Sequence, residues 1–228
     1  MTTAYQITDR IQIDKHITFV RINPTNVELT LKEVFDSLAN LSWLNEFDKV
    51  WLKEGYQVRA DATVKYIADN IIKAGDDKVT SNSGEYVISE LARLTQINEL
   101  SYSNIPLAEL IKKQKSGNPG FDFYSENPSN VLLFGEAKYL SNQNAYGRAF
   151  EQIVRFIKES ADIGDLPDVD AFCSDVSKSN VLKGIKGFSA SFASKDTSTE
   201  ILVKNIQENE DYNILTKFTE LVCVAVNL

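Results

Sequence analysis

The spacing of apolar residues along this chain alternates between the two-residue repeat of a strand and the three-to-four-residue repeat of a helix. Helical spacing predicts helices over residues 31–41, 64–72, 85–96, 107–115 and 146–157. Alternating or continuous apolar runs predict strands over residues 11–13, 17–22, 121–124, 131–139, 169–173, 188–193, 201–206 and 218–226, with a loop over 177–186. The pattern therefore predicts an α/β (α+β) fold, in which a mixed central β-sheet is flanked by helices.

Three large aromatic residues, Trp43, Phe47 and Trp51, follow the first predicted helix at four-residue spacing. Aromatic residues at this spacing are more often part of a core than of a partner surface. Glu90 lies on a different side of its predicted helix from the apolar residues, which predicts a solvated side chain. We therefore expect the three aromatic residues to be packed and Glu90 to face water.

The strand predicted over residues 131–139 combines a buried sequence with ionisable side chains. Its first four residues are apolar, as in a fully buried strand, but Glu136 and Lys138 follow closely. Side chains two residues apart in a strand point to the same face. Burying a carboxylate and an ammonium costs several kcal/mol unless they are paired or bind a metal ion. The strand therefore indicates a functional site, and we expect metal-dependent cleavage of nucleic acid.

Composition limits how such a chain would act on nucleic acid. Apolar residues make up 43% and charged residues 25% of the 228 positions, as in globular proteins, and we expect a single domain over residues 1–228. The formal net charge is −8 and the pI is near 4.8. Non-specific affinity for DNA comes mainly from neutralising phosphates, so an acidic chain is poorly suited to holding DNA alone. A partner that delivers the DNA is therefore expected.

Scarce residue types exclude several kinds of site. His16 is the single histidine and lies in a polar stretch, which argues against chemistry that needs several histidine ligands or a histidine base. Cys173 and Cys223 are fifty residues apart without a CxxC motif, so neither a disulfide framework nor a zinc site is indicated. No apolar run of transmembrane length and no signal peptide are visible, which predicts a cytoplasmic protein without membrane contact.

Carboxylates, lysine and a hard metal ion remain as candidates for hydrolytic chemistry. Mg²⁺ is bound by one or two carboxylates together with water and substrate phosphate, and Mn²⁺ accepts similar oxygen ligands. Asp122 and Glu136 lie on adjacent predicted strands and supply two carboxylates, while the backbone carbonyl of Ala137 adds a neutral ligand. Lys138 would orient or deprotonate the attacking water, or offset charge in the transition state.

The register between these two strands decides whether the carboxylates meet. A symmetric turn over residues 125–130 places Asp122 opposite Leu133 rather than Glu136. Bringing both carboxylates together therefore requires a bulge or a strand offset.

Neighbouring helices supply two additional catalytic candidates. Glu85 begins its predicted helix, where the helix dipole favours an acid, and it is equally a candidate for a further carboxylate at the site. Gln152 lies on the polar face of the helix that follows the Lys138 strand. Both residues have an ordinary explanation and a functional one, and the sequence leaves both open.

Candidate DNA contacts come from two groups of cations, namely Lys112, Lys113 and Lys115 near the end of the 107–115 helix, and Arg148 and Arg155 on the 146–157 helix. Cations near a helix C-terminus also stabilise the helix dipole, and most polar helix faces are simply solvated. Contact with phosphate is the functional alternative for both groups.

The order of these residues resembles the PD-(D/E)xK nuclease superfamily. The resemblance rests on a helix with Glu85, on Gly120-Phe121-Asp122, on a gap of fourteen positions, and on Phe134-Gly135-Glu136-Ala137-Lys138 before another helix. It covers residues 84–157, about a third of the chain, and Phe121 stands where the motif has proline. The resemblance implies a restriction-endonuclease-like core at about residues 60–175 with elaborated ends. It also implies metal binding by Asp122 and Glu136 and hydrolysis assisted by Lys138.

The strand over residues 135–139, its cap rich in serine, asparagine and glutamine, and the length of the chain resemble the HamA family, the nuclease subunits of bacterial Hachiman anti-phage systems. This resemblance implies a DNA endonuclease or nickase subunit in a hetero-oligomer with a superfamily 2 helicase subunit of the HamB type. Two alternatives remain. One is a stand-alone restriction-type endonuclease, against which the acidic charge counts. The other is a non-catalytic interaction protein with a degenerate nuclease fold, in which Glu136 and Lys138 form a structural ion pair.

Overall fold

A mixed six-stranded sheet lies at the centre of the computed structural model, which describes residues 4–72, 79–112 and 120–228. The strands are β1 (Tyr5–Asp14), β2 (Ile17–Pro24), β3 (Phe123–Glu126), β4 (Leu132–Lys138), β5 (Gly187–Ser194) and β6 (Glu220–Asn227). The helices are α1 (Val27–Ala39), the 3₁₀ helix η1 (Ser42–Glu46), α2 (Val50–Asn70), α3 (Ser81–Leu100), α4 (Ala108–Ile111), α5 (Tyr146–Lys158), α6 (Ala161–Gly164), α7 (Leu166–Val169), α8 (Asp175–Leu182), α9 (Thr199–Gln207) and α10 (Glu210–Leu215).

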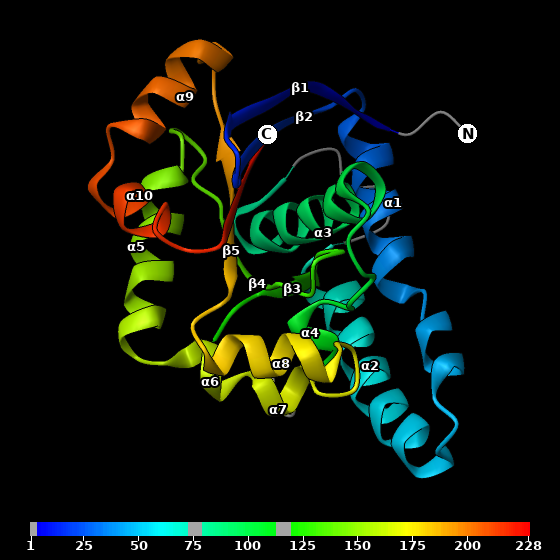
Figure 1. The fold of residues 1–228 in the computed structure, drawn as a ribbon. Helices are drawn as coiled ribbons and strands as arrows, with labels where there is room; N and C mark the ends of the chain where they lie inside the picture. The colour runs from blue at the N-terminus through cyan, green and yellow to red at the C-terminus, as the bar shows by residue number, and fades with distance from the viewer. Residues whose placement is uncertain (1–3, 73–78, 113–119) are drawn as a thin grey trace.

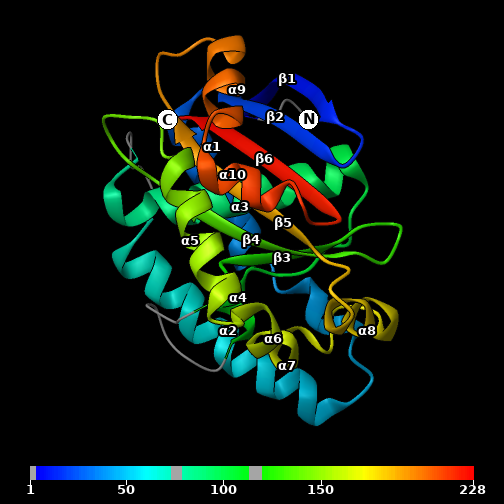
Figure 2. The ribbon, with the colours of Figure 1, turned by 60° about the vertical axis from the view of Figure 1, so that its left-hand side comes forward.

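The strand order is β1-β2-β6-β5-β4-β3, with parallel pairing from β2 through β4 and an antiparallel strand at each edge. Figure 1 shows α3 on one side of this sheet and α5 on the other, and Figure 2 shows the strands side by side. The predicted α/β class with a mixed sheet and flanking helices is confirmed. Four of the six strands lie outside residues 60–175, so the segments on both sides of that range contribute to the same sheet.

Two helices cover β4 and β5 from opposite sides. Ala149, Phe150 and Ile153 of α5 are buried at the predicted helical spacing, and α5 packs on these two strands. The α3 helix packs on the same strands, where Gln96 donates a 2.7 Å hydrogen bond to the Ser189 hydroxyl. Since both faces of β4 are covered, every residue in it except the last is buried.

The segment 201–206 is helical, and the predicted strand is wrong. Ser198 caps α9 by accepting a hydrogen bond from the Ile201 N–H, and Leu202 and Ile206 are buried one turn apart. The side chain of Ile201 is 55% exposed. The cap and the four-residue spacing of buried positions therefore override the β-propensity of the aliphatic residues.

The predictions for residues 169–173 and 177–186 are also wrong. Instead of a strand, the first segment contains the end of α7 and a turn, because Pro167 lies in the first turn of that short helix. Instead of a loop, the second contains most of α8, which begins where the Ser174 side chain accepts from the Ser177 N–H. Within the described residues, the helix predicted over 107–115 corresponds to the single turn of α4, and residues 113–119 lie outside the described parts of the chain.

The aromatic residues after α1 form a cluster that excludes one of its predicted members. Trp43 and Phe47 pack with Tyr56 and Phe172, with ring centroids 5.2 to 6.2 Å apart. Trp51, in the first turn of α2, is 69% exposed. The core prediction therefore fails for Trp51, because η1 ends before α2 begins and the four-residue repeat does not run through one continuous helix.

No helix in the described parts of the chain is both long and apolar enough to span a membrane.

Cross-strand packing of Phe123 on Gly135 gives a stability prediction. A Cβ atom at Gly135 would lie 2.4 Å from the ring of Phe123, which is fully buried. Gly135→Ala is therefore expected to lower the free energy of unfolding by about 1–3 kcal/mol, as overpacking does. Urea denaturation measures this change.

The matched control is Gly55→Ala in α2, where a new Cβ meets no atom within 4 Å. It is expected to raise the free energy of unfolding by about 0.5–1 kcal/mol, because alanine is the better helix former. A Gly135→Ala protein as stable as the wild type would contradict the close packing of β3 against β4.

Candidate active site

The hairpin of β3 and β4 brings the two predicted metal-binding carboxylates together without a bulge. Phe123 pairs with Gly135 in a regular register that continues to Glu126 and Leu132. The Asp122 N–H donates to the Gly135 carbonyl at 2.9 Å, so Asp122 lies beside Glu136. The symmetric turn over 125–130 is wrong, because β3 continues to Glu126 and the chain reverses between residues 127 and 131.

The turn itself explains this longer register. The Asn127 N–H donates to the Val131 carbonyl at 3.0 Å, and its side chain accepts from the N–H groups of Ser129 and Val131. Asn130 adopts a left-handed conformation with φ of 57°, which asparagine tolerates better than most residues. These local hydrogen bonds fix the reversal and therefore fix which residue faces Asp122.

Four predicted residues meet at the end of β4. The Lys138 ammonium lies 2.8 Å from Glu136 Oε1 and 3.2 Å from Glu85 Oε1. The Asp122 carboxylate accepts a hydrogen bond from the Ala137 N–H at 2.8 Å. Glu85 comes from the first turns of α3, and the other residues come from the hairpin. The structure therefore brings three carboxyl groups and one lysine into one cluster.

Burial governs the electrostatics of this cluster. Glu136 is 1% exposed, and burial raises the pKa of its carboxyl well above the ordinary value; the Asp122 charge adds to this rise, and Lys138 offsets only part of it. Burial likewise raises the pKa of Asp122 to about 6, against the opposing effects of Lys138 and the Ala137 N–H. For Lys138, burial lowers the pKa, but the Glu136 and Asp122 charges outweigh it and raise the pKa above its ordinary value. Lys138 is therefore an ammonium at neutral pH.

The donor set fits a hard divalent cation. Glu136 Oε2 is buried and has no hydrogen-bond partner in the described parts of the chain, although such an oxygen is costly to leave unpaired. With all groups ionised, the cluster carries one ammonium against three carboxylates. Among the described residues, no group of three or more His, Cys, Asp or Glu side chains is placed so that it could hold a metal ion. Mg²⁺ needs only one or two carboxylates, and Asp122 and Glu136 supply them.

The cluster lies in a cleft of about 900 Å³ between α2, α3 and α5. Gln152 and Arg155 of α5 line this cleft together with Glu85, Asp122, Glu136 and Lys138. Tyr66 and Asn70 from the end of α2 also line the cleft. Gln152 and Arg155, both candidates from the polar face of the 146–157 helix, thus share one cavity with the carboxylates. Arg148 lies on α5, where its side chain is 67% exposed and pairs with Glu151.

Lys112, one of the predicted DNA contacts, is buried in the structure. Its side chain is 4% exposed and pairs with Asp165, whose Oδ2 lies 3.1 Å from the ammonium. Asp165 was not a candidate from the sequence, since 53 positions separate it from Lys112 and no local pattern connects them. Lys113 and Lys115 lie outside the described residues.

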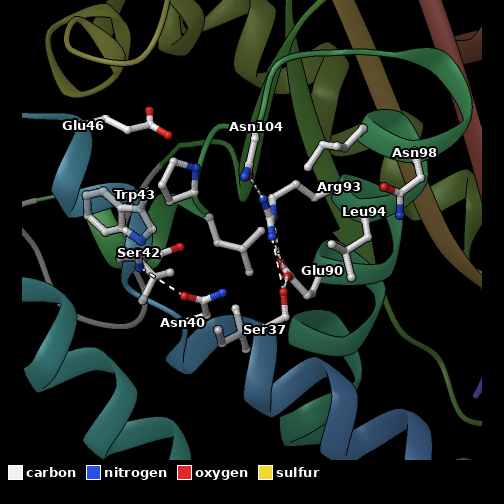
Figure 3. Close-up of a pocket in the computed structure, with 15 residues that line it drawn as sticks. Ser37, Asn40, Ser42, Trp43, Glu46, Glu90, Arg93, Leu94, Asn98 and Asn104 are labelled. Carbon is white, nitrogen blue, oxygen red and sulfur yellow. Dashed lines mark hydrogen bonds and ion pairs between the residues drawn. The ribbon is translucent and has the colours of Figure 1, made fainter. Parts of the chain in front are cut away.

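A second cavity of about 280 Å³ lies between α1, η1 and α3, and none of the four cluster residues lines it. Figure 3 shows Glu90 and Arg93 pointing toward each other at this cavity, with Ser37 and Asn104 on either side. Glu90 is fully buried, so its predicted exposure is wrong. The reason is the Arg93 guanidinium one helical turn away, which binds both oxygens of the Glu90 carboxylate. The i,i+3 spacing of these two charges was the available signal.

Comparison of the chain with protein-family models, curated proteins and solved structures found no match in any of the three.

The raised pKa of Asp122 gives a prediction for stability as a function of pH. Its pKa is about 6 in the folded chain against an ordinary value of 3.8, so the folded state binds this proton more tightly than the unfolded state. The contribution of Asp122 to stability therefore falls as pH rises from about 4 to above 6. In EDTA at pH 7, Asp122→Asn is expected to stabilise the fold by about 1–3 kcal/mol, and the gain should vanish near pH 4.

Asp175→Asn is the control with the opposite sign. Its pKa is lowered by a hydrogen bond and ion pair with Lys178 on the surface, so its contribution is present at neutral pH and lost on acidification. Thermal denaturation of both variants from pH 4 to 8 makes the comparison. An Asp122→Asn protein that is less stable than the wild type at pH 7 would indicate a structural carboxylate.

Proposed function

We propose that this chain is a metal-dependent deoxyribonuclease that hydrolyses phosphodiester bonds at the cluster of Asp122, Glu136 and Lys138. The observation that carries the proposal is the unpartnered, buried Oε2 of Glu136, beside Asp122 and on the same strand as a paired lysine. Charged groups so placed are costly for stability, which is a common property of catalytic sites. Their position in a 900 Å³ cleft gives substrate a route to them.

Asp122 and Glu136 would hold the metal ion, with the Ala137 carbonyl as a further ligand. When bound, Mg²⁺ or Mn²⁺ supplies a Lewis acid for the phosphoryl oxygen and lowers the pKa of water. The two carboxylates are held for this purpose by the hairpin register and by the Ala137 N–H that donates to Asp122. Because their pKa values are raised, a metal ion has to displace protons from these carboxyls, and its affinity should increase with pH.

Lys138 acts as a cation and donor rather than as a general base. Its raised pKa keeps the ammonium protonated while Glu136 and Asp122 are ionised. The ammonium is therefore suited to orient the attacking water and to offset negative charge as the phosphate is cleaved. Glu85, 46% exposed at 3.2 Å from the ammonium, holds Lys138 from the side of α3. Gln152, on the opposite wall, offers an amide to substrate.

The acidic character of the chain supports a role as a subunit. A net charge of −8 repels DNA phosphates, and the cleft-lining residues include more carboxylates than cations. Together with the resemblance to the HamA family, this charge supports a DNA endonuclease or nickase subunit in a hetero-oligomer with a superfamily 2 helicase of the HamB type, in bacterial anti-phage defence. The helicase would supply the phosphate contacts and control access to the cleft.

One observation favours the non-catalytic alternative, namely the direct 2.8 Å ion pair between Glu136 and Lys138. A purely structural pair would satisfy both carboxylate oxygens of Glu136, whereas Oε2 has no partner in the described chain. The nuclease proposal and the non-catalytic alternative predict opposite outcomes for the DNA-cleavage and metal-binding experiments that follow.

Cleavage should depend on the cluster and on a divalent ion. The chain is co-expressed with its helicase partner, purified as a complex, and assayed on plasmid DNA with Mg²⁺. Glu136→Gln and Lys138→Ala are each expected to lower the cleavage rate by about 10²-fold or more, and EDTA should abolish it. Lys204→Ala, on the exposed surface of α9 and outside every candidate set, should cleave like the wild type.

An active complex carrying Glu136→Gln would overturn the proposed site, and an inactive wild-type complex would overturn the proposed activity. Cleavage by the isolated chain at the same rate would favour a stand-alone endonuclease.

Metal binding should also be visible without any substrate. Mg²⁺ or Mn²⁺ is expected to raise the Tm of the wild-type chain, and the increase should grow from pH 6 to pH 8 as protons cease to compete for Asp122. The combined variant Asp122→Asn with Glu136→Gln should show no increase. An equal rise of Tm in this variant would indicate that the ion binds elsewhere.

A further inference from the structure

The Asp165 carboxylate accepts hydrogen bonds from three residues next to the candidate site. It lies between α6 and α7 and is 5% exposed. Its Oδ2 accepts hydrogen bonds from Lys112 Nζ at 3.1 Å, from the Phe121 N–H at 3.1 Å and from the Tyr124 hydroxyl at 2.7 Å. A carboxylate with three donors is well compensated for its burial.

Lys112 completes the arrangement from the other side. Its ammonium donates to the Phe121 carbonyl at 3.2 Å as well as to Asp165, and it lies 5.5 Å from the centre of the Tyr124 ring. The N–H of Phe121 is thus held by a carboxylate, and its carbonyl by an ammonium. Both peptide groups of this one residue are fixed by buried charges.

Gly120 makes this close approach possible. Its φ of 137° lies in the region that favours glycine. A Cβ atom there would lie 2.5 Å from Lys112 Nζ and 2.7 Å from Asp165 Oδ1. The Phe121 ring is held in turn by Phe134 and Phe156, with ring centroids 5.2 and 5.1 Å away. The backbone and side chain of Phe121 are therefore both immobilised.

The residue that follows is Asp122, which lies at the start of an edge strand. Its N–H donates to Gly135 and its carbonyl accepts from the Ala108 N–H at 3.0 Å. Because β3 has a strand on only one side, the sheet alone restrains it less than it restrains β4. Catalytic and metal-binding groups must be held to within about 0.5 Å, so an additional restraint at Phe121 bears directly on Asp122.

We propose that Lys112 and Asp165 are positioning residues, which clamp both peptide groups of Phe121 and thereby place the Asp122 carboxylate for metal binding. The inference rests on the proposed function. A buried ion pair is weak evidence of stabilisation, since apolar replacements are often neutral. Supporting groups around metal ligands, by contrast, typically change metal affinity by about 10–100-fold.

The chain contains a matched control pair. Lys186 and Asp162 form a second lysine–aspartate ion pair, in which the Asp162 side chain is 1% and the Lys186 side chain 13% exposed, and Asp162 lies on α6 three residues before Asp165. None of the hydrogen bonds described for this pair reaches β3 or β4. Disrupting it tests the general effect of losing such a pair in the same region.

The test measures binding of Mn²⁺ alone to the full chain, by electron paramagnetic resonance of the free ion and by calorimetry. Lys112→Met combined with Asp165→Asn is expected to weaken Mn²⁺ binding by about 10-fold or more while the fold is retained. Lys186→Met combined with Asp162→Asn should bind Mn²⁺ within about twofold of the wild type. Lys112→Arg alone keeps the charge and the donors. It should bind Mn²⁺ more tightly than the variant that combines Lys112→Met with Asp165→Asn.

If the double variant at Lys112 and Asp165 does not fold, the single variant Asp165→Asn is measured instead, since its amide still offers an acceptor to Phe121 and Tyr124. Wild-type affinity in these variants, or an equal loss in the Lys186 and Asp162 control, would overturn the positioning role. A wild-type chain that binds Mn²⁺ no better than Glu136→Gln would instead overturn the proposed function, and the positioning role with it.

Discussion

Burial of the Glu136 carboxylate at the end of a central strand carries a desolvation cost that its surroundings offset only in part. One oxygen is paired with Lys138, and the other has no partner in the described chain. Asp122 beside it increases the cost by like-charge repulsion. The fold maintains this arrangement because β4 is covered on both faces and hydrogen-bonded on both edges. The energy stored there is what a bound cation would release.

The two strands that carry the candidate site, β4 and β3, are held in place in different ways. The parallel strands β4 and β5 are buried and packed between α3 and α5, so Glu136 and Lys138 are fixed by the sheet itself. The four-residue edge strand β3 has one neighbour, and Asp122 precedes it. Its position depends on groups outside the sheet, namely the Asn127 turn, the α4 backbone and the buried pair of Lys112 and Asp165. The candidate site therefore combines the end of β4, which the sheet fixes, with the start of β3, which depends on contacts from outside the sheet.

Charge connects this site to the proposed role as a subunit. Catalysis of phosphodiester cleavage requires a phosphate near the carboxylates, yet the chain and its cleft are acidic. A bound divalent ion would reverse the local sign of the potential at the cluster, and Lys138 and Arg155 would extend that effect along the cleft. The partner would then bind the DNA that lies outside the cleft. Such a division would keep the proposed nuclease activity low until the partner delivers DNA.

The features that the sequence by itself determined are those that follow from the spacing of residues within one strand or helix. The two-residue repeat places Glu136 and Lys138 on one face of β4, and the helical repeat of α5 places Gln152 and Arg155 together. Tertiary structure alone decided the rest. The register that sets Asp122 beside Glu136 depends on hydrogen bonds within the turn, and Glu90 is buried because Arg93 and Ser37 meet it there. Lys112 faces Asp165 across 53 positions, and a pairing of that kind leaves no trace in local spacing, because it is set by how distant segments pack.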